Sequence, residues 1–150
     1  MARRRARELA FQALFQADRG GADVLDVWEE IRVDLVLDDE EDAYGEGLDA
    51  ETVQLAERLV RTFAERREAV DAELEALIEG WTFGQMAQTD LNVLRLALAE
   101  RIALDVPGEV TVEMAVRLAK KYGGEDSGRF VNGVLAKVLR RASEHGAAAR

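Results

Sequence analysis

The chain has 150 residues, of which 48% are hydrophobic and 33% charged, with a single proline and no cysteine. This length suits one domain that buries about two-thirds of its unfolded surface. The lack of cysteine excludes disulfides, thiolate zinc sites and thiol nucleophiles. A formal net charge of −10 disfavours contact with polyanions, unless positive charge is gathered in one place.

The charge is distributed unevenly along the chain. Residues 1–19 contain five basic and two acidic residues, and residues 117–141 contain seven basic and two acidic residues. The intervening residues 20–116 carry a net charge of −18. If the two basic ends meet in the fold, they form one anion-binding patch. The alternative is that the arginines near the N-terminus are simply solvated.

Helical periodicity predicts the elements of the first half. A helix is expected over residues 3–18, because small and apolar side chains recur at helical spacing, and Gly20 and Gly21 should end it. A second helix is expected over residues 24–37. Residues 38–49 contain a dense acidic run and two glycines, which predicts an exposed loop.

The second half begins with a long helical pattern over residues 51–79 that should bend near residues 65–68 and end at Gly80. The next helix, over residues 90–104, should be capped by Thr89 or Asp90. It is apolar on most of its faces, which predicts a place at the centre of a bundle.

Two further helices are expected over residues 111–122 and 126–141, followed by a disordered tail at 142–150. About seven helices and no clear strand predict a single all-α domain over residues 1–150. No apolar run approaches the roughly 20 residues that span a bilayer. The stretch after the first arginines resembles a signal peptide only weakly, because Glu8, Gln12 and Gln16 interrupt its apolar residues. We therefore expect a cytoplasmic protein without a membrane segment.

No motif of the sequence indicates catalysis, a cofactor or a metal. The loop from Gly123 to Gly128 lacks the lysine and the preceding strand of a phosphate-binding loop. His145 has no partner histidine or cysteine at ligand spacing. The acidic run Asp38–Asp42 lacks the pattern of a calcium loop. We expect a protein that is not an enzyme.

Two aromatic residues beside positive charge indicate nucleic-acid binding. Phe130 lies about 100° from the buried stripe of the last helix, on the face of Asp126, Lys137 and Arg141. A ring at the edge of the core, next to cations, suits stacking on an unpaired base. The alternative is that Phe130 only closes the edge of the core.

The first helix repeats this pattern, because Phe15 shares a stripe with Phe11 and Arg4. Cations for the RNA backbone and a ring for a base are what single-stranded RNA requires. Phe11 is expected to help close the core. Arg117, Lys120 and Lys121 are expected on a solvated outer face of the preceding helix.

Three segments carry a family resemblance. They are residues 3–15 (RRRARELAFQALF), 89–97 (TDLNVLRLA) and 113–135 (EMAVRLAKKYGGEDSGRFVNGVL). They resemble the start, the central helix and the signature of the NusB transcription antitermination family. Residues 20–70 resemble the family in pattern only.

The resemblance implies an all-helical fold of two three-helix sub-bundles and a known activity. That activity is binding of the boxA element of ribosomal RNA leaders together with ribosomal protein S10, called NusE in this setting. The pair joins RNA polymerase and suppresses premature termination. The RNA contacts implied by the resemblance are Arg3, Arg4, Arg5, Arg7, Phe15, Asp90, Arg95, Asp126 and Phe130. Carboxylates in this set can accept hydrogen bonds from base amino groups and so add selectivity.

The sequence departs from the family at Phe15, where a tyrosine is usual, and this keeps the stacking plane but removes a hydroxyl. The acidic middle of the chain is complementary to a basic ribosomal protein, so NusE is expected to dock there. Two other functions stay open. One is an accessory domain of an RNA cytosine methyltransferase, and the other is a helix-turn-helix protein that binds duplex DNA. A homodimer that covers the arginine-rich helix also stays open.

Overall fold

The computed structural model describes residues 2–41, 49–78 and 80–148, and these residues form six α-helices and one short 3-10 helix without any strand. The helices are α1 (Ala2–Gly20), α2 (Val24–Glu41), α3 (Ala50–Leu77), η1 (Phe83–Gln85), α4 (Gln88–Ala103), α5 (Gly108–Gly123) and α6 (Glu125–Ala148). The all-α prediction is confirmed. The predicted number of about seven is close to the six α-helices and one 3-10 helix observed.

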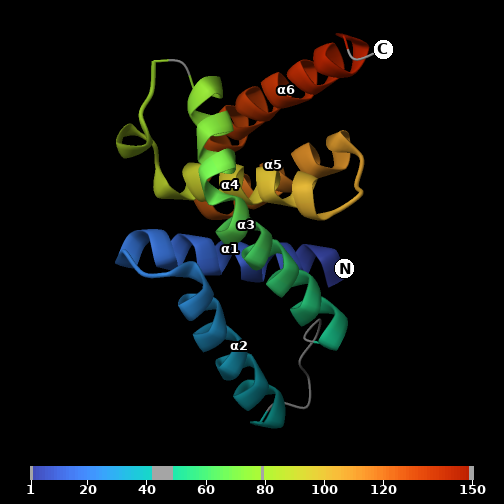
Figure 1. The fold of residues 1–150 in the computed structure, drawn as a ribbon. Helices are drawn as coiled ribbons and strands as arrows, with labels where there is room; N and C mark the ends of the chain where they lie inside the picture. Colours follow the sequence, from blue (N-terminus) through green and yellow to red (C-terminus); the bar gives the residue numbers. More distant parts are fainter. Residues whose placement is uncertain (1, 42–48, 79, 149–150) are drawn as a thin grey trace.

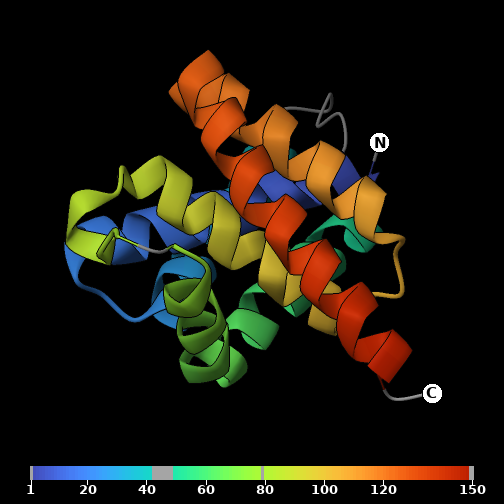
Figure 2. The same cartoon turned by 90° about the horizontal axis from the view of Figure 1, so that it is seen from above.

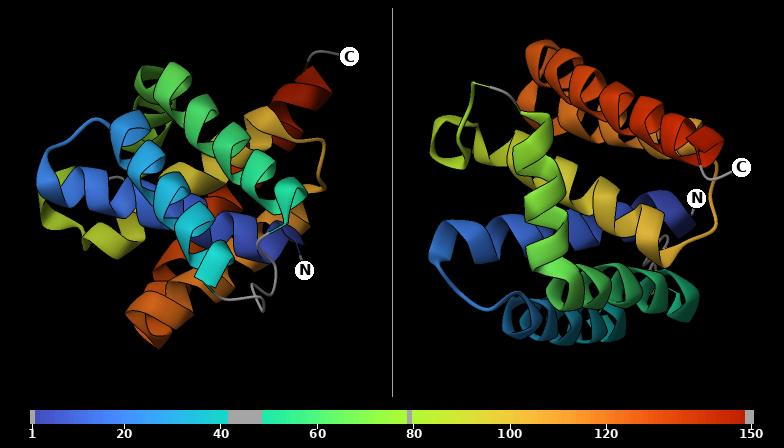
Figure 3. Two further views of the ribbon diagram at one scale, coloured as in Figure 1. Left: turned by 90° about the horizontal axis from the view of Figure 1, so that it is seen from below. Right: turned by 45° about the horizontal axis from the view of Figure 1, so that its top comes forward.

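The helices form two groups that share α1 and α3 (Figure 1). The helix α1 crosses the middle of the molecule, with α2 and the first half of α3 on one side and α4, α5 and α6 on the other (Figures 1 and 2). The most extensive packing joins α5 to α6, α3 to α4 and α1 to α3. The views in Figure 3 show α3 passing from one group into the other. The expected pair of sub-bundles is therefore present.

The long helix α3 is bent at Arg66, whose φ of −111° and ψ of 16° are not helical. This agrees with the bend predicted near residues 65–68. At its start, the Asp49 carboxylate accepts a hydrogen bond of 2.8 Å from the backbone N–H of Thr52. Such a cap satisfies one of the N–H groups that the first turn leaves without a helical partner.

The helix α4 is the core of the larger group, which it forms with α5, α6 and the second half of α3. Every residue of α4 from Leu91 to Glu100 is buried. This confirms the position predicted from its apolar faces. Three of the buried residues are polar, namely Asn92, Arg95 and Glu100. Since buried polar groups are costly without partners, these three must be held by contacts from other helices.

Several helix ends differ from the prediction. The helix α2 continues to Glu41, into the acidic run that was expected as a loop, and the remaining loop residues 42–48 lie outside the described part. The helix α6 continues to Ala148, beyond the predicted end at residue 141 and through most of the expected disordered tail. Glutamate and alanine are good helix formers, so these charged and small-residue stretches extend the helices before them.

The start of α4 was also predicted wrongly. Ala87 occupies the N-cap position and makes no side-chain cap, whereas Thr89 and Asp90 lie inside the first turn. A carboxylate in the first turn still favours the helix, because it faces the positive end of the helix dipole. None of the described helices is both long and apolar enough to cross a membrane.

Candidate nucleic-acid interface

The arginines of α1 point in different directions. Arg3 and Arg4 are exposed, and Arg5 is half-buried with its guanidinium 3.3 Å from the Glu8 carboxylate. Arg7 is buried, with 7% of its surface exposed, because it lies on the inner face of the helix. The basic N-terminal run therefore presents only part of its charge to solvent.

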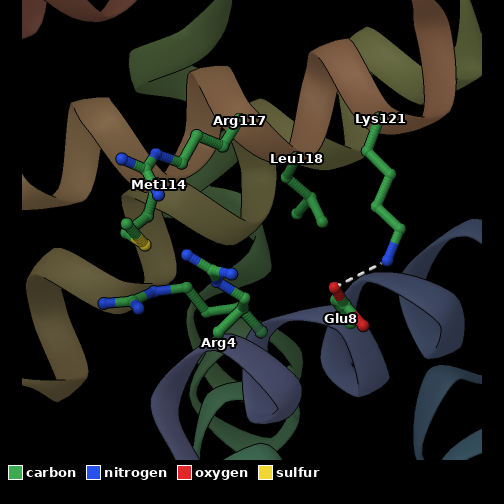
Figure 4. Close-up of a pocket in the computed structure, with 7 residues that line it drawn as sticks. Arg4, Glu8, Met114, Arg117, Leu118 and Lys121 are labelled. Carbon is green, nitrogen blue, oxygen red and sulfur yellow. Dashed lines mark hydrogen bonds and ion pairs between the residues drawn. The ribbon is translucent and has the colours of Figure 1, made fainter. Parts of the chain in front are cut away.

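The outward part of this run lines a pocket between α1 and α5 with a volume of about 210 Å³. Its walls are Arg4, Arg7 and Glu8 from α1 and Met114, Arg117, Leu118 and Lys121 from α5. Figure 4 shows Arg4 and Arg117 facing the same space from the two helices. Three exposed cations, Arg4, Arg117 and Lys121, stand against the single carboxylate of Glu8 over an apolar floor, and such a site attracts phosphate.

One ion pair joins the two walls of this pocket. The Lys121 ammonium donates a 2.9 Å hydrogen bond to the Glu8 carboxylate (Figure 4). Burial raises the pKa of Glu8, but the hydrogen bonds and charges of Lys121 and Arg5 outweigh it, so the pKa lies below its ordinary value. The same contact with Glu8 raises the pKa of Lys121. Glu8 therefore stays ionised and holds the ends of α1 and α5 together.

Aromatic rings continue the surface beyond the pocket. The ring centroids of Phe11 and Tyr122 are 4.9 Å apart, and those of Phe11 and Phe15 are 5.7 Å apart. Phe11 is buried, as expected, whereas Phe15 is half-buried and Tyr122 is exposed. The ring of Phe15 is thus partly accessible, about two turns along α1 from Glu8 in the pocket.

A tight turn brings the starts of α4 and α6 beside these rings. Gly124, with φ of +91°, separates α5 from α6. A Cβ atom at Gly123 would lie 2.3 Å from the Ser127 hydroxyl and 3.2 Å from the Thr89 methyl group, so these two side chains pack against the Gly123 backbone. Only glycine fits at both positions of the turn, for steric reasons at one and for its φ at the other.

Two carboxylates and a third ring lie around this turn. Asp90 is half-buried, and one of its carboxylate oxygens is buried without a hydrogen-bond partner. Asp126 is exposed and bonds to Arg129 on the next turn. The half-buried Phe130 meets Trp81 edge-on, with ring centroids 6.0 Å apart. Asp90, Asp126 and Phe130 therefore all lie near the turn between α5 and α6.

Arg7 and Arg95 are both buried in ion pairs, although Arg7 also reaches the wall of the pocket. The Arg7 guanidinium pairs with the buried carboxylate of Glu100, which also accepts a 2.7 Å hydrogen bond from the Thr111 hydroxyl. Arg95 is 4% exposed and donates two hydrogen bonds, of 2.9 and 3.0 Å, to the carboxylate of Asp71. Arg7 therefore holds α1 to α4 and, through Glu100, to α5. Arg95 holds α4 to α3.

Sequence reasoning missed two parts of the surface. Arg117 and Lys121 are exposed, as expected, but they also line the same pocket as Arg4. Trp81 carries no prediction above, yet half of it is exposed beside Phe130. The sequence shows the basic residues of α5, but it does not show that they face α1.

The model of the NusB family matches residues 4–140. The chain belongs to the NusB family. Its sequence is 48% identical to the transcription antitermination protein NusB of Thermus thermophilus over 141 residues, which cover 94% of this chain and 92% of that protein. Identity to the NusB of Deinococcus deserti is 45%, over 97% of this chain and 85% of that one.

Solved NusB structures share the fold. The NusB of T. maritima superposes with a TM-score of 0.77 at 35% identity, covering 92% of this chain and 90% of that one. A crystal structure of the antitermination factors NusB and NusE in complex with double-stranded RNA superposes with a TM-score of 0.75 at 27% identity. It covers 93% of this chain and 97% of the matched chain.

In the described part of our NusB-family chain, no group of three or more His, Cys, Asp or Glu side chains is arranged to hold a metal ion.

Proposed function

We propose that this NusB-family chain is a transcription antitermination factor, which binds the boxA element of ribosomal RNA leaders together with NusE and modifies elongation by RNA polymerase. The observation that supports this best is the pocket between α1 and α5, where cations from both ends of the chain converge. The pocket continues into accessible rings, and unpaired RNA needs both kinds of group.

The proposed roles follow from exposure and chemistry. Arg3, Arg4 and Arg5 contact phosphates, because they are the outward cations of α1. Phe15 and Phe130 stack on unpaired bases. Asp90 and Asp126 accept hydrogen bonds from base amino groups, and the exposure of Asp126 supports this. Arg7 and Arg95 act indirectly, since each is buried in an ion pair that fixes a helix of the site.

The relatives support the same activity. Chains of matching length are named transcription antitermination proteins, and one superposed structure contains NusB, NusE and RNA. We propose that NusE docks on the acidic side of this domain, where residues 20–116 carry the negative charge. Complementary charge of this kind speeds the encounter of two proteins.

The proposal is tested by measuring binding of fluorescently labelled boxA RNA by anisotropy, with and without NusE, across a range of salt concentrations. We expect preference for boxA over a scrambled RNA, tighter binding with NusE, and an affinity that falls as salt rises. The Arg4→Gln variant should reduce the salt slope by about one, because one phosphate contact is lost. Equal binding of boxA and scrambled RNA in the presence of NusE would contradict the proposal.

Two alternative functions are separated by simple competition and activity assays. A helix-turn-helix protein would bind duplex DNA more tightly than single-stranded RNA of the same sequence. An accessory domain of an RNA cytosine methyltransferase would bind the enzyme's RNA substrate without preferring boxA. A homodimer that covers α1 would dissociate when RNA is added, and analytical sedimentation with and without RNA would detect this.

A further inference from the structure

The two tryptophans of the chain occupy opposite environments. Trp28 is 1% exposed and its indole N–H lies 3.3 Å from the Glu57 carboxylate. Trp81 is 53% exposed, although it is one of the largest apolar side chains in the protein. Single exposed apolar side chains are common, but Trp81 lies against the ring of the half-buried Phe130, and exposed apolar side chains that lie together mark interaction sites.

The backbone holds Trp81 beside Phe130. Its N–H donates a 2.9 Å hydrogen bond to the carbonyl of Ile78, just after the end of α3. The following Thr82 is fixed by the Gln85 side chain, which accepts a 3.0 Å hydrogen bond from its N–H. The planes of the Trp81 and Phe130 rings are inclined at 62°. A flat base cannot lie parallel to both rings at once, so the pair offers two separate stacking surfaces.

Cations lie along the same edge of the molecule. Lys137 and Arg141 are about two and three turns beyond Phe130 on α6, on the face that carries its ring. The Lys137 ammonium donates a 3.3 Å hydrogen bond to the carbonyl of Leu77, and Arg141 donates a 3.4 Å hydrogen bond to the carbonyl of Ala76. Both side chains are thus directed to the end of α3, next to Trp81.

We infer that Trp81 is a further base-stacking residue, and that single-stranded RNA continues past Phe130 along the seam between α6 and the end of α3. Its next base stacks on Trp81, and the phosphates beyond that base lie near Lys137 and Arg141. An exposed ring between cations is the arrangement that binds unpaired nucleotides. This inference rests on the proposed function, because it lengthens the same RNA site.

The two tryptophans provide a direct test. In the Trp28→Phe variant the only remaining tryptophan is Trp81, so its fluorescence reports on that site alone. We expect boxA RNA extended by several nucleotides at each end to quench this fluorescence, because a stacked base quenches indole emission. The matched variant Trp81→Phe, which keeps only the buried Trp28, should show no quenching. The difference between the unmodified chain and Trp81→Phe gives the same signal if Trp28→Phe folds poorly.

Affinity gives a second, independent measurement. Replacing Trp81 with alanine should weaken binding of the extended RNA by about 5- to 100-fold, whereas Trp81→Phe should retain most of the affinity. The salt slope should not change in either variant, because no charge is removed. In contrast, Lys137→Gln should lower the salt slope by about one while leaving the quenching in place.

The outcomes separate this inference from the proposed function. If the extended RNA binds but neither quenches Trp81 nor depends on its ring, the inference is wrong and the proposed function stands. If no boxA RNA binds with or without NusE, the proposed function fails as well. If Trp81→Ala instead weakens binding of NusE while leaving RNA affinity unchanged, Trp81 belongs to a protein interface and the inference is overturned.

Discussion

Single residues of the arginine-rich start have different roles, although the sequence presents them as one run. Arg3 and Arg4 face solvent, and Arg7, about one turn later, faces inward to Glu100. The rotation of 100° per residue could be read from the sequence. The partner could not, because Glu100 is 93 residues away in the chain. Proximity of arginines in sequence therefore overstates how many can contact RNA.

The buried pair of Arg7 and Glu100 should matter greatly for stability. Replacing Glu100 with alanine leaves the Arg7 charge buried without its partner, so we expect the free energy of unfolding to fall by about 3–5 kcal/mol. Urea denaturation measures this. The control is Glu113→Ala, which breaks the exposed ion pair with Arg117 and should cost less than about 1 kcal/mol. A similar loss in both variants would contradict the role given to Glu100.

The ion pair of Glu8 and Lys121 should make stability depend on pH. Because the folded pKa of Glu8 lies below its ordinary value of 4.5, the pair contributes fully above that pH. The contribution is lost as pH falls through the lower, folded pKa. We expect Glu8→Gln to be less stable than the unmodified chain at pH 7 and to approach it below pH 4.5. A pH series of thermal melts tests this, and a constant difference across the series would contradict it.

The ring of Phe130 should contribute to RNA affinity rather than to the core alone. Replacing it with alanine should weaken boxA binding by about 1–3 kcal/mol, the usual value of one base–aromatic stack. Phe130→Tyr keeps the stacking plane and should bind almost normally. Anisotropy titrations of both variants with NusE present provide the comparison. Unchanged affinity in the alanine variant would remove Phe130 from the site.

At the scale of helices, the turn between α5 and α6 fixes the geometry of the site. Replacing a glycine with alanine should lower stability in this turn and raise it inside α6. Gly124 has a backbone conformation that only glycine adopts easily, so Gly124→Ala should cost about 1–3 kcal/mol of stability. Gly133 lies inside α6 with open space around it, so Gly133→Ala should stabilise by about 0.5–1 kcal/mol. Thermal denaturation of both variants decides, and destabilisation by Gly133→Ala would contradict this account.

The helices also show what a sequence can predict. The bend in α3 and the burial of α4 follow from local pattern, and both are confirmed. The ends of α2 and α6 were placed too early, because charged and small residues were read as loop although they favour helix. The pocket between α1 and α5 could not be predicted, since it exists only when the two ends of the chain pack together.

At the scale of the whole molecule, α3 contributes core residues to both sub-bundles. Leu59 and Phe63 are buried before the bend, and Val70 and Leu74 are buried after it. Because one helix serves both cores, we expect the chain to unfold in a single transition. Coincident urea curves from the fluorescence of Trp28, in the smaller group, and from helical circular dichroism would support this. Two separated transitions would contradict it.

The shared helix α3 also limits how such a chain can change in length. An added residue between the two buried stretches of α3 would rotate everything beyond it by about 100° and shift it by about 1.5 Å. Side chains that now face the second core would turn toward solvent, and the basic end of α6 would move relative to α1. Insertions and deletions during evolution should therefore be tolerated between helices and selected against within this one.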